Sequence, residues 1–174
     1  NSIYLKSNLN KICEMRNLII LFFLILISQS KVYACSILNV DIGTPVNAAS
    51  EKFDFLEEFD ASTYGDDYSV RFTMPAKDYC DESGLENADL EVIIYNSQIA
   101  GINVLSWDPN IKNEVYNFTN SFIGSLGSDL EKDRVGFKDL SLGNLLIVYT
   151  KYEHQEQIHE LLEITNSQLK DFAV

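Results

Sequence analysis

The chain has 174 residues, the size of one ordinary domain, and 46% of them are hydrophobic against 22% charged. With eight glycines, three prolines and three cysteines, it is not a collagen, a low-complexity chain or a disulfide-dense miniprotein. Twenty-six acidic and 13 basic residues give a formal net charge of −13, which argues against sequence-general nucleic-acid binding and electrostatic attachment to anionic lipid, because both need a basic surface.

An export signal is predicted near the N-terminus. Ten consecutive apolar residues, Leu18–Ile27, lie between a basic start and a small-residue exit. This pattern is typical of a secretory signal peptide, and the run is too short for a membrane-spanning helix, which needs about 20 apolar residues. We therefore predict that residues 1–34, an upstream segment followed by the signal peptide Met15–Ala34, are removed. Residues 35–174 would then form a single exported α+β domain.

Two alternative fates are predicted for Cys35. Val32–Cys35 resembles a bacterial lipobox, in which the cysteine becomes a lipidated N-terminal residue that anchors the protein to a membrane. Val32 and Ala34 also fit ordinary signal cleavage, after which an oxidising compartment favours a Cys35–Cys80 disulfide. Such a bond would contribute about 3–4 kcal/mol of stability. Because the chain has no Cys-x-x-Cys motif, redox exchange and cysteine zinc sites of that type are not expected.

The first half of the exported part is predicted to contain one helix and three strands. The helix is expected to begin at Pro45, after which apolar residues recur at helical spacing. Strict alternation of apolar and polar residues predicts a half-buried strand over Tyr68–Met74. Two further strands, Leu90–Tyr95 and Ile99–Trp107, are expected to be joined by a two-residue turn at Asn96–Ser97.

The second half is predicted to contain two helices around one strand. An apolar stripe from Ile111 to Leu126 indicates the first helix, and the mixed segment 128–143 is expected to be mostly loop with a short element around Phe137. The almost wholly apolar Leu145–Thr150 favours a strand covered on both faces. A capping-box pattern then precedes an amphipathic spacing from Ile158 to Phe172, which predicts a C-terminal helix.

The predicted elements follow the order α-β-β-β-α-β-α. This order favours an α+β fold, with a mainly antiparallel sheet of four to five strands and about three helices packed on it. Ser36–Ile42 is the candidate for an extra edge strand. If the last strand joins through a crossover helix, the sheet would include one parallel pair.

Residues that would carry chemistry are sparse. In the predicted C-terminal helix, Glu156, His159 and Glu163 would occupy neighbouring turns, which makes them the candidate metal ligands. His159-Glu160-x-x-Glu163 resembles a zinc-protease helix but lacks its second histidine, and His154 would point to a different side of the helix. We favour a solvated helix face for these residues, and assign no catalytic residue, metal or cofactor.

Two functional classes remain. Removing residues 1–34 leaves nine basic and 25 acidic residues, a net charge of −16, which favours solubility and permits a cationic partner. The favoured class is an exported, non-enzymatic binding or accessory domain in the periplasm, the envelope or the medium. Its partner would be an unknown protein or a cationic ligand, and it would contact a membrane only through a lipid on Cys35. The alternative is an exported hydrolase that uses carboxylates with His154 or His159 as the acid–base group.

Overall fold

The central feature of the fold is a β-sheet in which every neighbouring pair of strands is antiparallel. The computed structural model describes residues 35, 38, 41–51, 53–56, 68–80, 83–106, 108, 112–123, 126–127, 130 and 134–173. These residues belong to one compact unit, Tyr33–Val174. The predicted export signal and the predicted strand end at Trp107 lie outside the described residues.

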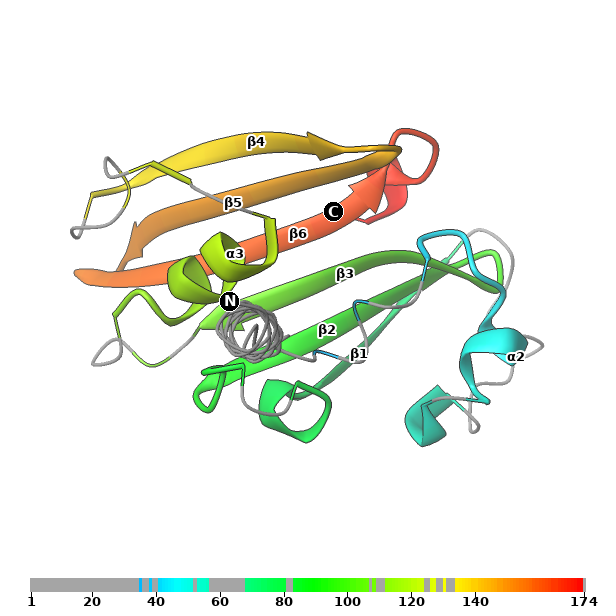
Figure 1. Ribbon diagram of the computed structural model, residues 1–174. Helices are drawn as coiled ribbons and strands as arrows, with labels where there is room; N and C mark the ends of the chain where they lie inside the picture. The colour runs from blue at the N-terminus through cyan, green and yellow to red at the C-terminus, as the bar shows by residue number, and fades with distance from the viewer. Residues whose placement is uncertain are drawn as a thin grey trace, which may run out of the picture. The chain divides into compact units, whose positions relative to one another are not determined.

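Six strands are found in the described part of the chain, in two groups of three. They are β1 (Ser69–Pro75), β2 (Ala88–Tyr95), β3 (Gln98–Ser106), β4 (Gly136–Leu142), β5 (Leu145–His154) and β6 (Gln157–Asn166). Helix α3 (Glu114–Ile123) connects the two groups, and the spatial order is β1-β2-β3-β6-β5-β4 (Figure 1). Strands β3 and β6 therefore meet antiparallel in the middle of the sheet, and the described strands contain no parallel pair.

The first three strands confirm the sequence prediction. In β1, Val70, Phe72 and Met74 are half-buried and the residues between them are exposed. Asn96 and Ser97 both have positive φ, 50° and 57°, as the mirror-image turn of a two-residue hairpin requires. A mainly antiparallel sheet is likewise confirmed, although it has six strands rather than four or five, and the described residues contain two α-helices rather than three.

The predicted C-terminal helix is wrong, because its residues form β6, which pairs with both β3 and β5. Gln155 and Glu156, with φ of 52° and 63°, make the two-residue turn between β5 and β6. The even-numbered residues of β6 face the core, and this alternation is disguised at Glu160, a charged residue in a core position. Leucines on both faces of the strand also imitate the spacing of a helical stripe.

Two other predictions in the second half also need correction. The short element expected around Phe137 is confirmed, but it is the seven-residue strand β4 and takes up much of the expected loop 128–143; its polar sequence suits an edge strand that buries little surface. Strand β5 extends to His154 and buries one face, at Ile147, Tyr149 and Lys151, rather than two.

The helices are shorter than predicted. Helix α2 spans only Val46–Ala49, and a separate 3₁₀ turn, η2 (Asp54–Leu56), follows it. Helix α3 starts at Glu114, because Asn113 has a left-handed φ of 62° and cannot belong to the helix. The expected edge strand Ser36–Ile42 is not formed by its described residues, although Pro45 makes an isolated bridge to Gln98.

The two faces of the sheet differ in what packs against them. The core face carries the buried side chains of Leu90, Val92, Ile102, Val104, Ile147 and Leu162, and Val115 and Phe118 of α3 belong to the same cluster. The opposite face, called the outer face here, carries Arg71, Glu91, Asn103, Val148 and Glu163. The C-terminal 3₁₀ turn η5 (Lys170–Phe172) contacts this outer face at β3.

Candidate functional site

The C-terminal segment folds back onto the outer face and forms one wall of a pocket. Phe172 stacks on Tyr95 of β2, with ring centroids 3.8 Å apart and an interplanar angle of 6°. Ala173 packs beside Ile93 in a small separate cluster. Gly101 allows this close approach, because a Cβ atom there would lie 2.8 Å from the Cβ atom of Ala173. The register between β2 and β3 shifts next to Gly101, and a glycine within a strand often marks such an irregularity.

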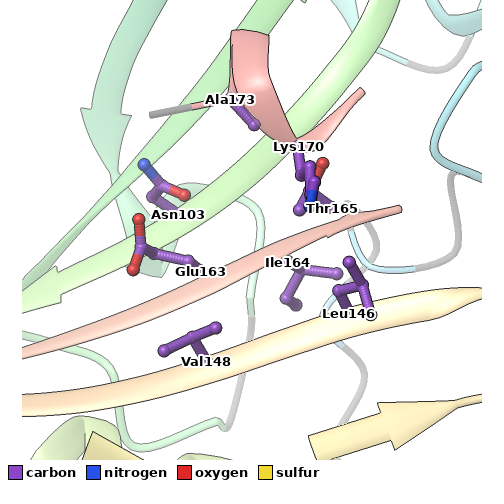
Figure 2. Close-up of a pocket in the computed structure, with 8 residues that line it drawn as sticks. All are labelled: Asn103, Leu146, Val148, Glu163, Ile164, Thr165, Lys170 and Ala173. Atoms are coloured by element: carbon purple, nitrogen blue, oxygen red, sulfur yellow. The ribbon is translucent and has the colours of Figure 1, made fainter. Parts of the chain in front are cut away.

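Beside this segment, β3, β6 and β5 form the floor of a pocket of about 190 Å³ (Figure 2). Its apolar lining comes from Leu146, Val148, Ile164 and Ala173. Asn103 and Glu163 lie at one end of the pocket, and Lys170 and Thr165 lie at the other. The pocket therefore has an apolar middle and polar residues at both ends, the combination typical of small-molecule sites; the end at Asn103 and Glu163 is called the polar end below.

The polar end contains a buried acceptor that no described residue pairs with. Asn103 Nδ2 donates to Glu91 Oε1 at 2.9 Å, and Arg71 donates to the same oxygen at 2.8 Å. Because a carboxylate oxygen only accepts, the first bond fixes which end of the Asn103 amide is the oxygen. Asn103 is 5% exposed, and its Oδ1 has no hydrogen-bond partner in the described part of the protein.

Glu163 supplies further acceptors at the same end. It pairs directly with Asn103 across β3 and β6, which places the two side chains next to each other on the outer face (Figure 2). Burial raises the pKa of the Glu163 carboxyl; the positive charge of Arg71 opposes this rise, and the negative charge of Glu91 adds to it. Oxygen acceptors therefore lie together at the polar end, where a ligand group that donates hydrogen bonds would satisfy them.

The residues that the sequence suggested as metal ligands are spread along β6. Glu156 lies exposed in the β5–β6 turn, whereas Glu163 lies in the pocket. His159 is four residues from Glu163, a distance of about 13 Å along a strand. Among the described residues, no three histidine, cysteine or acidic side chains are grouped so that they could hold a metal ion.

The two histidines lie close together on the β5–β6 hairpin. Their rings lie 6.1 Å apart between centroids, and the His159 ring also stacks on Tyr152 at 5.5 Å. The hairpin brings them to one face, which corrects the expectation that His154 and His159 point to different sides. Neither histidine lines the pocket.

Sequence reasoning missed a buried polar cluster on the core face. Glu160 accepts hydrogen bonds from the backbone N–H groups of Val115 and Tyr116, at 3.2 and 3.1 Å, and from the hydroxyl of Tyr149 at 2.6 Å. Its negative charge is thus placed at the N-terminus of α3, where the helix dipole favours an anion. Burial first, and then the charge of Glu160, raise the pKa of Tyr149, so the phenol stays a hydrogen-bond donor.

Lys151 completes this cluster. Its Nζ lies 3.9 Å from Glu160 Oε1 and donates to Asn113 Oδ1 at 2.6 Å and to the carbonyl of Leu130 at 2.7 Å. The side chains of Lys151 and Glu160 are only 1% and 3% exposed. Because the cluster is closed to solvent, its role is to join α3 to β5 and β6 rather than to act on a substrate. The sequence signal for this cluster would have been a charged residue at a core position in each of two paired strands, Lys151 in β5 and Glu160 in β6.

Cys35 and Cys80 form a disulfide, which confirms one of the two predicted fates of Cys35. Both residues are buried in the main core. A lipid thioether would need the same sulfur atom of Cys35, so a lipidated chain would carry Cys80 as a free thiol.

Comparison with protein-family models, with curated proteins and with solved structures finds no match to this chain. None of the helices in the described ranges has the length and hydrophobicity of a membrane span.

Proposed function

We propose that this chain is an exported, non-enzymatic binding protein that holds a small ligand in the pocket on the outer face of its sheet. The observation that carries this proposal is the buried Oδ1 of Asn103, which has no partner among the described residues and belongs to a residue lining the pocket. Leaving a buried acceptor unsatisfied costs about 1–3 kcal/mol, and most buried polar groups are paired. A ligand that donates to this oxygen would recover that cost.

Binding is a better match to the pocket than hydrolysis. The acid–base candidates His154 and His159 lie outside the pocket lining, and the cluster around Glu160 and Lys151 is closed to solvent. The pocket itself offers one carboxylate, Glu163, against the apolar side chains of its middle. These features support a site that holds a ligand without transforming it.

Export is supported by two features of the chain. Disulfides persist mainly in oxidising compartments outside the cytosol, and this chain has the Cys35–Cys80 disulfide. The predicted signal peptide Met15–Ala34 would end immediately before Cys35. We therefore propose that the mature protein, residues 35–174, resides in the periplasm, the outer envelope or the medium.

The binding proposal is tested by nuclear magnetic resonance on residues 35–174 with labelled methyl groups. The chain is titrated with small amines, alcohols and carboxylates of equal length. We expect at least one class to shift the methyl signals of Leu146 and Val148 in a saturable way, while the core methyl groups of Leu90 and Val92 stay in place. A panel that leaves the Leu146 and Val148 signals unmoved would refute a binding function for this pocket.

The export proposal is tested by the intact mass of the protein from membrane and soluble fractions, with and without reductant. We expect a species that begins at Cys35 and is lighter by two hydrogen atoms than its reduced form. A membrane species with added acyl mass on Cys35 would instead establish a lipoprotein. A mass that still contains Leu18–Ile27 would contradict removal of the signal peptide.

A further inference from the structure

We infer that the pocket selects a primary ammonium group on a short hydrocarbon chain, whose N–H groups donate to Asn103 Oδ1 and to the carboxylate of Glu163. This inference names the ligand class for the site proposed above, and it rests on that proposal.

The described residues that line the polar end, Asn103 and Glu163, leave acceptors rather than donors available to a ligand. The amide N–H₂ of Asn103 is already engaged with Glu91, and that carboxylate also holds Arg71. What remains for a ligand is the unpartnered Oδ1 of Asn103 and the carboxylate of Glu163, which forms no ion pair with the described residues. An ammonium group carries three donors and a positive charge, so it can satisfy both neighbours at once. A carboxylate or phosphate would place further acceptors against acceptors.

The middle of the pocket determines the chemistry of the ligand beyond its ammonium group. Leu146, Val148 and Ala173 give it an apolar surface that favours hydrocarbon. The pocket volume of about 190 Å³ suits a short hydrocarbon chain. We therefore use n-pentylammonium, which has five carbons and one nitrogen, as the probe.

The charges around Glu163 decide how binding depends on pH. Arg71 on β1 and Glu91 on β2 are paired with each other, and Lys170 on η5 is exposed at the far end of the pocket. Burial raises the pKa of Glu163, so the free protein retains a proton there to a higher pH than an ordinary glutamate does. The ammonium group replaces this proton, and its affinity should rise as the pH rises through the pKa of Glu163.

The test compares three probes of equal length: n-pentylammonium, 1-pentanol and pentanoate. Calorimetry and methyl signals of residues 35–174 are used to measure binding. We expect n-pentylammonium to bind at least tenfold more tightly than 1-pentanol, and pentanoate to bind most weakly. Tighter binding of pentanoate, or equal binding of the ammonium and the alcohol, would overturn the inference.

Three variants locate the binding energy. Asn103→Leu and Glu163→Gln should each weaken n-pentylammonium about 10- to 100-fold, the loss expected for a hydrogen bond to a charged group, and should change 1-pentanol little. Glu153→Gln, an exposed change on the β5–β6 hairpin, is the matched control and should change neither. Unshifted methyl signals of the core face confirm that each variant is folded. An unchanged ammonium affinity in Glu163→Gln would refute the assigned contact.

Lys170, a positive residue at the far end of the pocket, provides a second check on the charge of the ligand. Lys170→Gln removes a like charge from the far end of the pocket and should leave the affinity for n-pentylammonium equal or raise it, by less than about fivefold for an exposed charge. Loss of ammonium binding in this variant would contradict the assignment.

The compound Nα-acetyl-lysine methylamide distinguishes two sources of the ammonium group, a lysine side chain and a free amine. Tighter binding than n-pentylammonium points to a lysine side chain of a polypeptide, and weaker binding to a free amine.

Failure of this inference can be separated from failure of the proposed function. If 1-pentanol or pentanoate shifts the pocket methyl groups and n-pentylammonium does not, the ligand class is wrong and the binding site stands. If none of the small probes shifts them, the pocket has no binding function and both proposals fall.

Discussion

Replacing Glu160 with glutamine should lower the free energy of unfolding by about 3 kcal/mol. The change keeps the size of the side chain and removes its charge. Glu160 accepts hydrogen bonds from Val115, Tyr116 and Tyr149, and bonds to a charged partner are worth about 1 kcal/mol more than neutral ones. Removing one partner of a buried ion pair costs roughly 3–5 kcal/mol in total, a figure that includes these weakened bonds as well as the loss of the anion beside Lys151. Lys151 keeps two oxygen acceptors, which places the expected loss near the lower figure.

Urea unfolding of the disulfide-intact chain, followed by circular dichroism, measures this loss. Glu153→Gln on the exposed part of the same hairpin is the control and should change the free energy of unfolding by no more than about 0.5 kcal/mol. Lys151→Met combined with Glu160→Gln should cost less than the sum of the two single changes, because each single variant leaves the other group unpaired. A loss below about 1 kcal/mol in Glu160→Gln would refute the buried position, since a solvated helix face predicts a loss of that size.

Three further predictions concern the turn, the disulfide and a buried carboxylate. Glu156→Gly should raise the free energy of unfolding by about 1 kcal/mol because Glu156 has a φ of 63°, whereas glycine inside a helix costs about 1 kcal/mol; urea unfolding gives the sign, and a loss contradicts the hairpin. Replacing Cys35 and Cys80 together by serine should cost about 3–4 kcal/mol in the same assay, and an unchanged midpoint would mean that the bond is not formed. Burial raises the pKa of Glu114, so the folded state binds this proton more tightly than the unfolded state, and stability should fall as pH rises from 4.5 through that pKa. Glu114→Gln should remove this part of the pH dependence, and a difference from the parent that is constant with pH would contradict it.

The first three strands could be predicted because local pattern and fold agree there. Val70, Phe72 and Met74 alternate with exposed residues, and Asn96 accepts the positive φ that a two-residue turn needs. Strand β6 lacked both signals, because its turn is Gln155–Glu156 rather than an asparagine–glycine pair, and Glu160 occupies a core position. Tertiary pairing with β3 and β5 outweighs the local helical spacing.

The candidate site could be predicted only in part. The sequence identified Glu163 as a candidate ligand-binding residue, but for a metal site that assumed a helix. Asn103 gave no signal of its own, because an unpaired amide oxygen is a property of the folded neighbourhood. The two residues are distant in the chain and become neighbours only when β6 docks on β3. The pocket also needs the return of the C-terminal segment past Gly101, which no local pattern predicts.

The antiparallel pairing of β6 between β3 and β5 is the claim on which the pocket depends. Backbone nuclear Overhauser effects from residues 35–174 test it most directly. We predict interstrand contacts from Glu163 to Asn103 on one side and to Val148 on the other, in the register of the structure. Contacts between residues three apart throughout 158–172, as in a helix, would contradict the sheet, the pocket and the function proposed for it.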